Sequence, residues 1–299
     1  MIDLHSHLLP GIDDGARDLD MALTMARAAV DGGVKVQACT PHIMPGVWNN
    51  TGPAIQAAVA ELQGKIDEEG IPLRLVAGAD VRVVPNLVAG LQSGHLLSLA
   101  GTRYVLIEPP HHVAPPRLDE AFFGLLTAGY VPILTHPERL AWVESHYDMV
   151  VRLARSGVWM QITSGSLTGS FGSKPKYWGE RMLDDGLVHL LASDTHNMKR
   201  RPPDLAYGRE AAARIVGEEE ARNLVLTRPY GILRNSPPSE LPQPLVESAR
   251  GGYASVPAKQ NSRKTRGRKT DRKTDMSGHG GSGDSGIVDW MRRLFQRRA

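Results

Sequence analysis

The chain opens with Met1-Ile-Asp-Leu-His-Ser-His7, a short apolar stretch that ends in two histidines. The stretch predicts a β-strand over residues 2–5. Because residues i and i+2 of a strand face the same side, His5 and His7 would project together. A His-x-His pair is often incidental when it stands alone, so its meaning depends on what the following strands carry.

Short apolar, β-branched runs alternate with longer helix-like stretches over residues 1–235. Many of these stretches end at a glycine just before the next run, as helix C-termini favour. The predicted strands are Ile2–His5, Lys35–Thr40, Leu73–Ala77, Tyr104–Glu108, Val131–Thr135, Trp159–Thr163 and Val188–Ala192. Seven successive βα units imply a parallel sheet, and at this length a closed or distorted barrel is favoured over an open sheet. A doubly wound open sheet is the alternative, but no glycine-rich phosphate loop follows a predicted strand.

Ligand-type side chains recur where these strands end. In a βα barrel the C-terminal ends of the strands form one ring, and active sites are built there. The residues at these positions are His5, His7, His42, Asp80, Glu108, His136, Asp194 and His196. Imidazole and carboxylate together suit Zn, Mn or Fe rather than Ca. Their recurrence at successive strand ends predicts a metal cluster.

The other histidines and the cysteine have different interpretations. His189 falls inside the seventh predicted strand, so we expect it to pack in the core. His111 and His112 follow Glu108 and are candidates for the rim of the pocket. Cys39 is best interpreted as a small buried apolar residue of the second strand.

The net charge of +3 is divided unevenly along the chain. Lys259 to Ala299 carries twelve Lys/Arg and four Asp, which leaves about −5 (+3 minus +8) for residues 1–258. An acidic body argues against nucleic-acid binding. The single cysteine, with no signal-like or membrane-spanning apolar run, predicts a cytoplasmic protein.

The composition changes at about Ser236. A polar, basic, Gly/Ser-rich linker over residues 236–286 is predicted to be disordered. Residues 287–298 place Trp290 and Phe295 on one side of a helical wheel and arginines on the other, which predicts an amphipathic helix. Such a helix suits peripheral contact with the inner face of the cell membrane, or packing on the barrel or on a protein partner.

Five motifs in this order resemble the polymerase and histidinol phosphatase (PHP) superfamily. They are Met1-Ile-Asp-Leu-His-Ser-His, Asp13-Asp-Gly, Thr40-Pro-His, Thr135-His-Pro-Glu-Arg and Ser193-Asp-Thr-His. More narrowly, residues 1–235 resemble the bacterial protein-tyrosine phosphatases of capsule and exopolysaccharide operons. The resemblance implies a distorted (β/α)₇ barrel with three metal ions, commonly Mn or Fe. It also implies dephosphorylation of tyrosines on a partner kinase that regulates polysaccharide export.

The resemblance further implies a division of the ligands among three metals. The sets are His5, His7, Asp80 and Asp194 for the first, Asp80 as a bridge with Glu108 and His136 for the second, and Asp14, His42 and His196 for the third. Arg139 and Arg201 match the family's phosphate-binding arginines, and a planar guanidinium pairs well with phosphate oxygens. The superfamily usually has Glu where this chain has Asp80, and the choice between Asp13 and Asp14 stays open.

The expected chemistry is hydrolysis of the phosphotyrosine ester by a metal-activated hydroxide. No covalent phospho-enzyme is expected, because Cys39 lacks the Cys-x₅-Arg loop of thiol-based phosphatases. Two rival functions are a small-molecule phosphatase, for example of histidinol phosphate, and a non-catalytic regulatory subunit. The complete ligand set disfavours the regulatory subunit, and the acidic body disfavours a DNA exonuclease.

Overall fold

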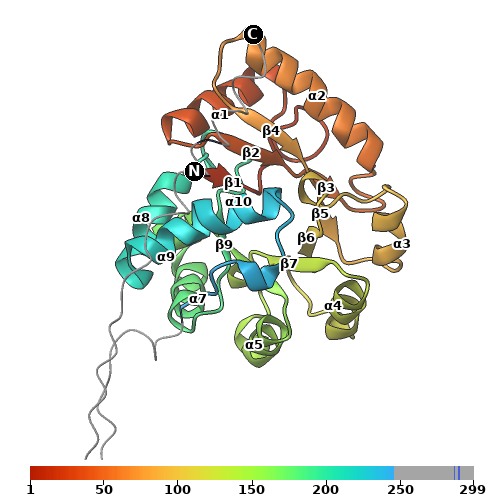
Figure 1. Ribbon diagram of the computed structural model, residues 1–299, viewed down its shortest axis with the longest axis vertical. Coiled ribbons are helices and arrows are strands. Elements are labelled where there is room, and N and C mark those ends of the chain that lie inside the picture. The colour runs from red at the N-terminus through yellow and green to blue at the C-terminus, as the bar shows by residue number, and fades with distance from the viewer. Residues whose placement is uncertain (246–285, 287–288, 290–299) are drawn as a thin grey trace, which may run out of the picture. The chain divides into compact units, whose positions relative to one another are not determined.

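A computed structural model describes residues 1–245, Gly286 and Asp289, and shows an α/β fold with strands at the centre and helices outside (Figure 1). The strands are β1 (Ile2–Asp3), β2 (Val36–Cys39), β3 (His42–Ile43), β4 (Arg74–Ala77), β5 (Asp80–Arg82), β6 (Tyr104–Glu108), β7 (Val131–Thr135), β8 (Trp159–Thr163) and β9 (Leu190–Ala192). The α-helices are α1 (Leu19–Asp31), α2 (Gly52–Glu68), α3 (Leu87–Gln92), α4 (Leu118–Thr127), α5 (Tyr147–Arg155), α6 (Ser164–Thr168), α7 (Ser173–Asp184), α8 (Leu205–Val216), α9 (Glu218–Arg222) and α10 (Arg228–Leu233). Short helical turns include η2 (Pro137–Arg139), a π-helical η4 (Asn223–Thr227) and η5 (Pro238–Glu240).

The strands form two parallel sheets, with the orders β1-β2-β4 and β3-β5-β6-β7-β8-β9. The second predicted strand corresponds to β2, and after Pro41, which has no N–H for the ladder, the chain forms β3 in the other sheet. The third is followed after Gly78 by β5. A parallel bridge between Ser6 and Thr195 brings the chain after β1 beside the chain after β9. Parallel sheets are confirmed, and closure into a barrel remains a prediction.

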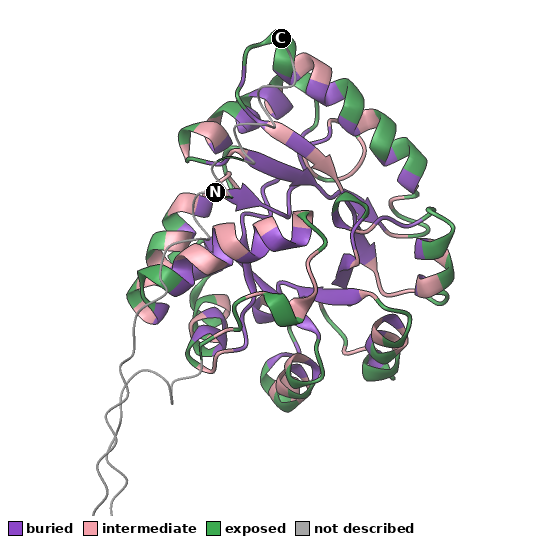
Figure 2. Cartoon of the chain, in the orientation of Figure 1, coloured by how far each residue is buried: buried purple, intermediate pink, exposed green. Residues whose placement is uncertain are grey.

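The central strands of the larger sheet are buried on both faces. Every residue of β6, β7 and β8 is buried, and the surrounding helices are exposed on their outer sides (Figure 2). Strands buried on both faces consist of nearly continuous apolar residues, which is why the sequence located them well. The prediction that His189 packs in the core is confirmed, since its ring is buried and stacked 4.8 Å from that of Trp159.

The segment after residue 235 still packs on the compact unit. Tyr104 Oη donates to the carbonyl of Ser236 at 2.7 Å, and Arg228 Nε donates to the carbonyl of Pro242 at 2.6 Å. The backbone carbonyls of Ser236 and Pro242, in the first part of the predicted linker, thus contact side chains of residues 1–235. The predicted helix over 287–298 and most of the linker lie outside the described residues.

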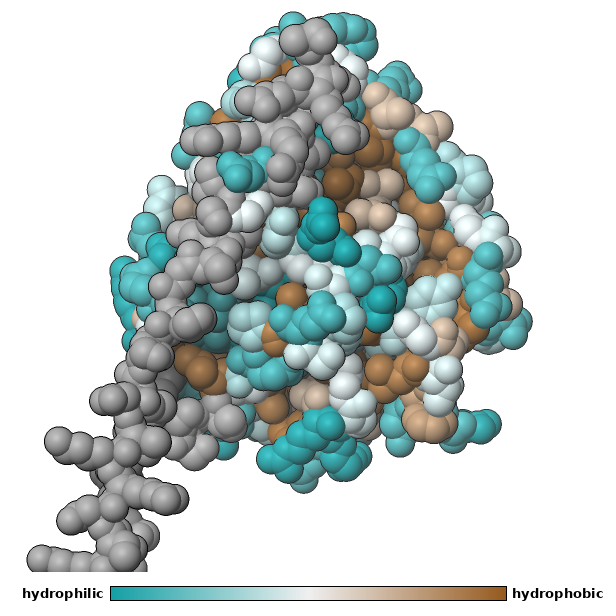
Figure 3. Space-filling model, viewed as in Figure 1, coloured by the Kyte–Doolittle hydropathy of each residue, from teal (hydrophilic) through white to brown (hydrophobic). Residues whose placement is uncertain are grey.

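The face crossed by α10 carries mainly hydrophilic side chains, and the apolar ones lie in separate groups (Figure 3). Within residues 1–245, no helix has the length and apolar character needed to cross a bilayer.

Candidate metal centre

The structure gathers the predicted ligands into one cluster at the ends of the parallel strands, in which all but the exposed Asp14 are buried. His5 and His7 follow β1, while Glu108 ends β6. The remaining ligands begin β3 and β5 or follow β7 and β9; they are His42, Asp80, His136, Asp194 and His196. Overlapping groups of these side chains each have ligand atoms within 4.8 Å of one another. Strand ends in register thus assemble the cluster from distant parts of the chain.

The first histidine pair projects as the strand periodicity predicts. His5 Nε2 and His7 Nε2 lie 3.3 Å apart, and both residues are fully buried. His5 Nε2 also lies 3.5 Å from Asp80 Oδ2 and 3.4 Å from Asp194 Oδ1. Two carboxylates and two imidazoles therefore face one point at the end of β1.

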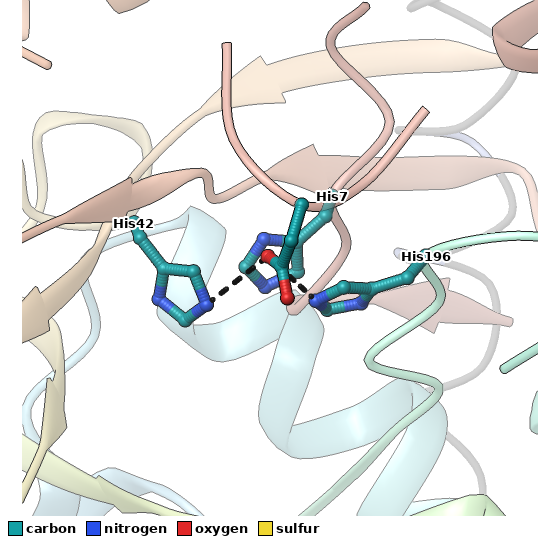
Figure 4. A group of neighbouring side chains, drawn as sticks. His7, His42 and His196 are labelled. Atoms are coloured by element: carbon teal, nitrogen blue, oxygen red, sulfur yellow. Dashed lines mark ion pairs between the residues drawn. The ribbon is translucent and has the colours of Figure 1, made fainter. Parts of the chain in front are cut away.

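A second group converges on Asp14, which lies in the loop between β1 and α1. Its Oδ1 is 3.5 Å from His42 Nε2 and 3.3 Å from His196 Nε2. Figure 4 shows the rings of His7, His42 and His196 turned toward the same carboxylate. The neighbouring Asp13 has a different position, because its Oδ2 binds His7 Nδ1 at 2.6 Å. Of these two aspartates, Asp14 belongs to a group of side chains whose ligand atoms converge, together with His7, His42 and His196.

A third group surrounds Glu108. Its carboxylate lies 3.6 Å from His42 Nδ1 and 3.9 Å from His136 Nε2. His136 Nε2 is also 3.9 Å from Asp80 Oδ2, so Asp80 stands between this group and the group at β1. His111, predicted as a candidate for the rim, binds Glu108 Oε1 through Nε2 at 3.1 Å.

Asp194 connects the histidines to both predicted arginines. Its Oδ2 accepts hydrogen bonds from Arg139 Nη1 and Arg201 Nη2. Its Oδ1 lies on the other side, 3.5 Å from His7 Nε2. The arginine side chains are 14% and 20% exposed, against 1% for Asp194, so they lie at the solvent edge of the cluster.

Two of the candidate ligands have a strained backbone. His136 has φ of 35° and Asp194 has φ of 52°, both in the left-handed region that residues with a Cβ seldom adopt. Such strain costs roughly 1–3 kcal/mol and concentrates at functional sites. Here it follows directly after β7 and β9, where the chain turns each side chain into the cluster.

Charged neighbours outweigh burial in setting the pKa of two groups of the cluster. Burial raises the pKa of Asp194, but Arg201, His5, His7 and Arg139 outweigh burial and hold it well below its ordinary value. Burial lowers the pKa of His7, but Asp13 and Asp194 outweigh burial and raise it to about 10. Metal ligation requires neutral imidazole, so binding of a cation would displace this proton from His7.

The surroundings of His136 and His196 keep both imidazoles neutral, which is the protonation state that metal ligation requires. Burial, reinforced by Arg139, lowers the pKa of His136 to about 3. Burial and then the charge of His7 lower the pKa of His196 to about 4.

Unpartnered buried atoms support a fit to divalent cations. Within residues 1–245, buried atoms of the cluster without a hydrogen-bond partner include Asp80 Oδ2, Asp194 Oδ1, His42 Nδ1 and His196 Nε2. Leaving a buried carboxylate oxygen unpaired is costly, and metal coordination would offset that cost. The donor set of imidazole nitrogen and carboxylate oxygen suits Mn, Fe or Zn.

The sequence reasoning missed several residues that support this cluster. Gln161 Oε1 accepts from His5 Nδ1 at 2.7 Å, and Arg82 Nη1 lies 3.5 Å from Glu108 Oε2. Asp3 binds Ser193 through both the backbone N–H, at 3.1 Å, and the hydroxyl, at 2.5 Å. A glutamine in the middle of the apolar β8 was the one signal that pointed to such a residue.

Comparisons with known proteins find bacterial tyrosine-protein phosphatases that are similar to this chain. Tyrosine-protein phosphatase YwqE of Bacillus subtilis is 39% identical over 201 residues, which cover 67% of this chain and 79% of YwqE. Tyrosine-protein phosphatase CpsB of Streptococcus agalactiae is 27% identical over 240 residues, 79% of this chain and 99% of CpsB.

A crystal structure described as one of YwqE from Bacillus subtilis and CpsB from Streptococcus pneumoniae, "unique metal-dependent tyrosine phosphatases", superposes with a TM-score of 0.76. It is 35% identical and covers 82% of this chain and 99% of its own. The family model for capsular polysaccharide synthesis proteins, CpsB/CapC, matches residues 1–234. The resemblance inferred from the sequence motifs is confirmed, and the chain belongs to the CpsB/CapC family of capsular polysaccharide synthesis.

Proposed function

We propose that this protein is a metal-dependent protein-tyrosine phosphatase. The observation that carries the proposal is the buried cluster of imidazoles and carboxylates with two arginines bound at its solvent edge. Cations and guanidinium groups placed together suit a phosphate ester, whose charge both can neutralise. The names of the relatives, tyrosine-protein phosphatases of two bacteria, support the choice of substrate.

We propose that the cluster holds three divalent cations, with Mn, Fe or Zn as the candidate metals. The ligand sets are His5, His7, Asp80 and Asp194; Asp80, Glu108 and His136; and Asp14, His42 and His196. Bound there, the cations would lower the pKa of a coordinated water towards neutrality and so supply the nucleophile for attack on phosphorus. The position of Asp80 between the first two sets supports a bridging role despite its short side chain.

Arg139 and Arg201 are proposed to bind the phosphoryl group. Each donates through one Nη to Asp194, which leaves other N–H groups of each guanidinium for phosphate oxygens. Their attachment to one carboxylate oxygen orients both toward the same place. They would hold the phosphoryl group and neutralise charge on its oxygens as the ester bond breaks.

The leaving group and the cysteine also fit this proposal. A tyrosine phenolate has a conjugate acid pKa of about 10, so it needs less protonation than an alkoxide on leaving. Burial raises the pKa of the Cys39 thiol, and the residue is 0% exposed. The only cysteine of the chain is therefore unsuited to act as a nucleophile.

We further propose the setting in which the enzyme works. Its substrate would be a tyrosine kinase of polysaccharide export, reached in the cytoplasm or at the inner face of the membrane through residues 287–298. The bridge between Ser6 and Thr195 supports closure of the two sheets into a distorted (β/α)₇ barrel, with the cluster at its mouth.

Substrate preference tests this proposal. Manganese-loaded protein should release phosphate from a phosphotyrosine peptide much faster than from the matched phosphoserine peptide or from histidinol phosphate. A preference for histidinol phosphate would replace the proposal with a small-molecule phosphatase. Hydrolysis of none of the three substrates would favour a regulatory protein.

A further inference from the structure

The arginine of the Thr135–Arg139 motif has an aromatic support that the proposed chemistry does not account for. The guanidinium carbon of Arg139 lies over the ring of Phe171, 4.4 Å from its centroid. Phe171 is half-buried and belongs to the connection between α6 and α7, far from Arg139 in the sequence. A cation held over a ring face is attracted by the negative face of the ring.

The backbone of this connection places the ring tightly. Gly169 and Gly172 have φ of 85° and 92°, so two left-handed residues enclose Phe171. The N–H of Ser170 donates to the carbonyl of Gly165 at 2.8 Å. A Cβ on Gly165 would lie 2.8 Å from Phe171 Cε2, so the ring packs against bare backbone.

Glu138, the neighbour of Arg139, binds the end of β8 and the helix α6 that precedes this connection. Its Oε1 accepts hydrogen bonds from the Thr163 N–H at 2.9 Å and from the Ser166 hydroxyl at 2.7 Å. Glu138 is 1% exposed, so water does not compete for these bonds. Of these two consecutive residues, Glu138 thus binds α6 through its carboxylate, and Arg139 contacts Phe171, in the connection after α6, through its guanidinium.

Arg201 is positioned differently. Its carbonyl accepts the N–H of His196 at 2.9 Å and the hydroxyl of Thr195 at 3.0 Å, and Asn197 Oδ1 accepts the N–H of Arg200 at 2.8 Å. These bonds fix the backbone of Arg201, and its guanidinium, like that of Arg139, is bound by Asp194 Oδ2. Arg139 has in addition the ring of Phe171 against the face of its guanidinium.

We propose that Phe171 is a positioning residue for phosphate binding. Its ring holds the Arg139 guanidinium in the orientation in which its free N–H groups can bind the phosphoryl group. The inference rests on the proposed function and extends it. Without the ring, Arg139 keeps its bond to Asp194 but is free to rotate about it. The loss should therefore appear in phosphate affinity and KM, and not in metal binding.

The test compares aromatic and aliphatic replacements in the full-length, manganese-loaded protein. Phe171→Leu keeps an apolar side chain without a π face, and it should weaken binding of inorganic phosphate roughly 3- to 30-fold by calorimetry. Phe171→Tyr should stay close to wild type. The matched control is Phe123→Leu on α4, where the phenylalanine is 67% exposed, and it should change nothing. Metal content, measured by elemental analysis, should be equal in all variants.

Double mutants identify the residue through which Phe171 acts. Phe171→Leu should add little to Arg139→Ala, because the group that it positions is already gone, but it should add its full effect to Arg201→Ala. Equal effects in both backgrounds, or a loss of metal from Phe171→Leu, would overturn the inference. If Phe171→Leu binds phosphate as the wild type does, and the wild type hydrolyses phosphotyrosine, the inference about Phe171 fails but the proposed function stands. A wild type that binds no phosphate and hydrolyses no phosphotyrosine overturns the proposed function as well.

Discussion

Gln161→Leu should weaken metal binding although Gln161 is not a proposed ligand. Its Oε1 accepts from His5 Nδ1 at 2.7 Å, and its Nε2 donates to the carbonyl of Ile162 at 3.0 Å, which fixes the orientation of the amide. His5 therefore carries its proton on Nδ1 and presents Nε2 to the carboxylates. Outer partners of this kind orient a ligand and raise its basicity.

The expected loss of metal affinity in Gln161→Leu follows from the burial of Gln161 and His5. His5 is 0% and Gln161 is 1% exposed, so no solvent replaces the lost acceptor. An unpaired buried donor costs about 1–3 kcal/mol, or roughly 5- to 150-fold in a binding constant. Losses of about 10- to 100-fold are typical when such partners of metal ligands are removed. We therefore expect Mn²⁺ affinity at the His5 position to fall by about 10- to 100-fold.

The assay is a competition titration of Mn²⁺ between chelator-stripped protein and a chromophoric chelator. Gln63→Leu is the matched control, because Gln63 is also buried and its Oε1 accepts from the Leu75 N–H at 2.7 Å, outside the cluster. Both variants should lose stability, but only Gln161→Leu should lose metal affinity. A Gln161→Leu protein with wild-type affinity would refute the reasoning, as would equal losses in the two variants.

Three further predictions address the bridge, the arginines and the core. Asp80→Asn should lower the content of two metals, since Asp80 Oδ2 lies near both His5 and His136; loss of at most one equivalent by elemental analysis argues against a bridge. Arg139→Ala or Arg201→Ala should weaken inhibition by phosphate with metal content intact, and the reverse pattern would show the assignment to be wrong. Arg228→Met should lower the free energy of unfolding, measured by urea denaturation, by about 3–5 kcal/mol, because it removes the arginine that lies 2.7 Å from the buried carboxylate of Glu220. A decrease of less than about 1 kcal/mol would contradict this prediction.

The sequence located the strands and the site because both depend on local patterns. Runs such as Tyr104–Glu108 and Val131–Thr135 are buried on both faces, so their apolar character predicted β6 and β7 with correct bounds. Ligand residues stand next to these runs, and parallel strands bring their ends together. Order along the chain therefore predicted proximity in space.

The missed features depend on contacts between residues far apart in the sequence. Nothing near Gln161 indicates that its amide lies against His5, and nothing in the loop at Phe171 indicates a contact with Arg139. The contact of Pro242 with the buried Arg228 is of the same kind, because the prolines of this segment indicated only a linker.

The central claim is that hydrolysis of phosphotyrosine depends on metals held by this cluster. The most direct test strips the full-length protein with chelator, verifies metal removal by elemental analysis, and follows phosphate release from a phosphotyrosine peptide as Mn²⁺ is added back. We predict that stripped protein is inactive and that activity returns with Mn²⁺, whereas His136→Ala, which lacks a proposed ligand, does not recover. Full activity of the metal-free protein would contradict the account.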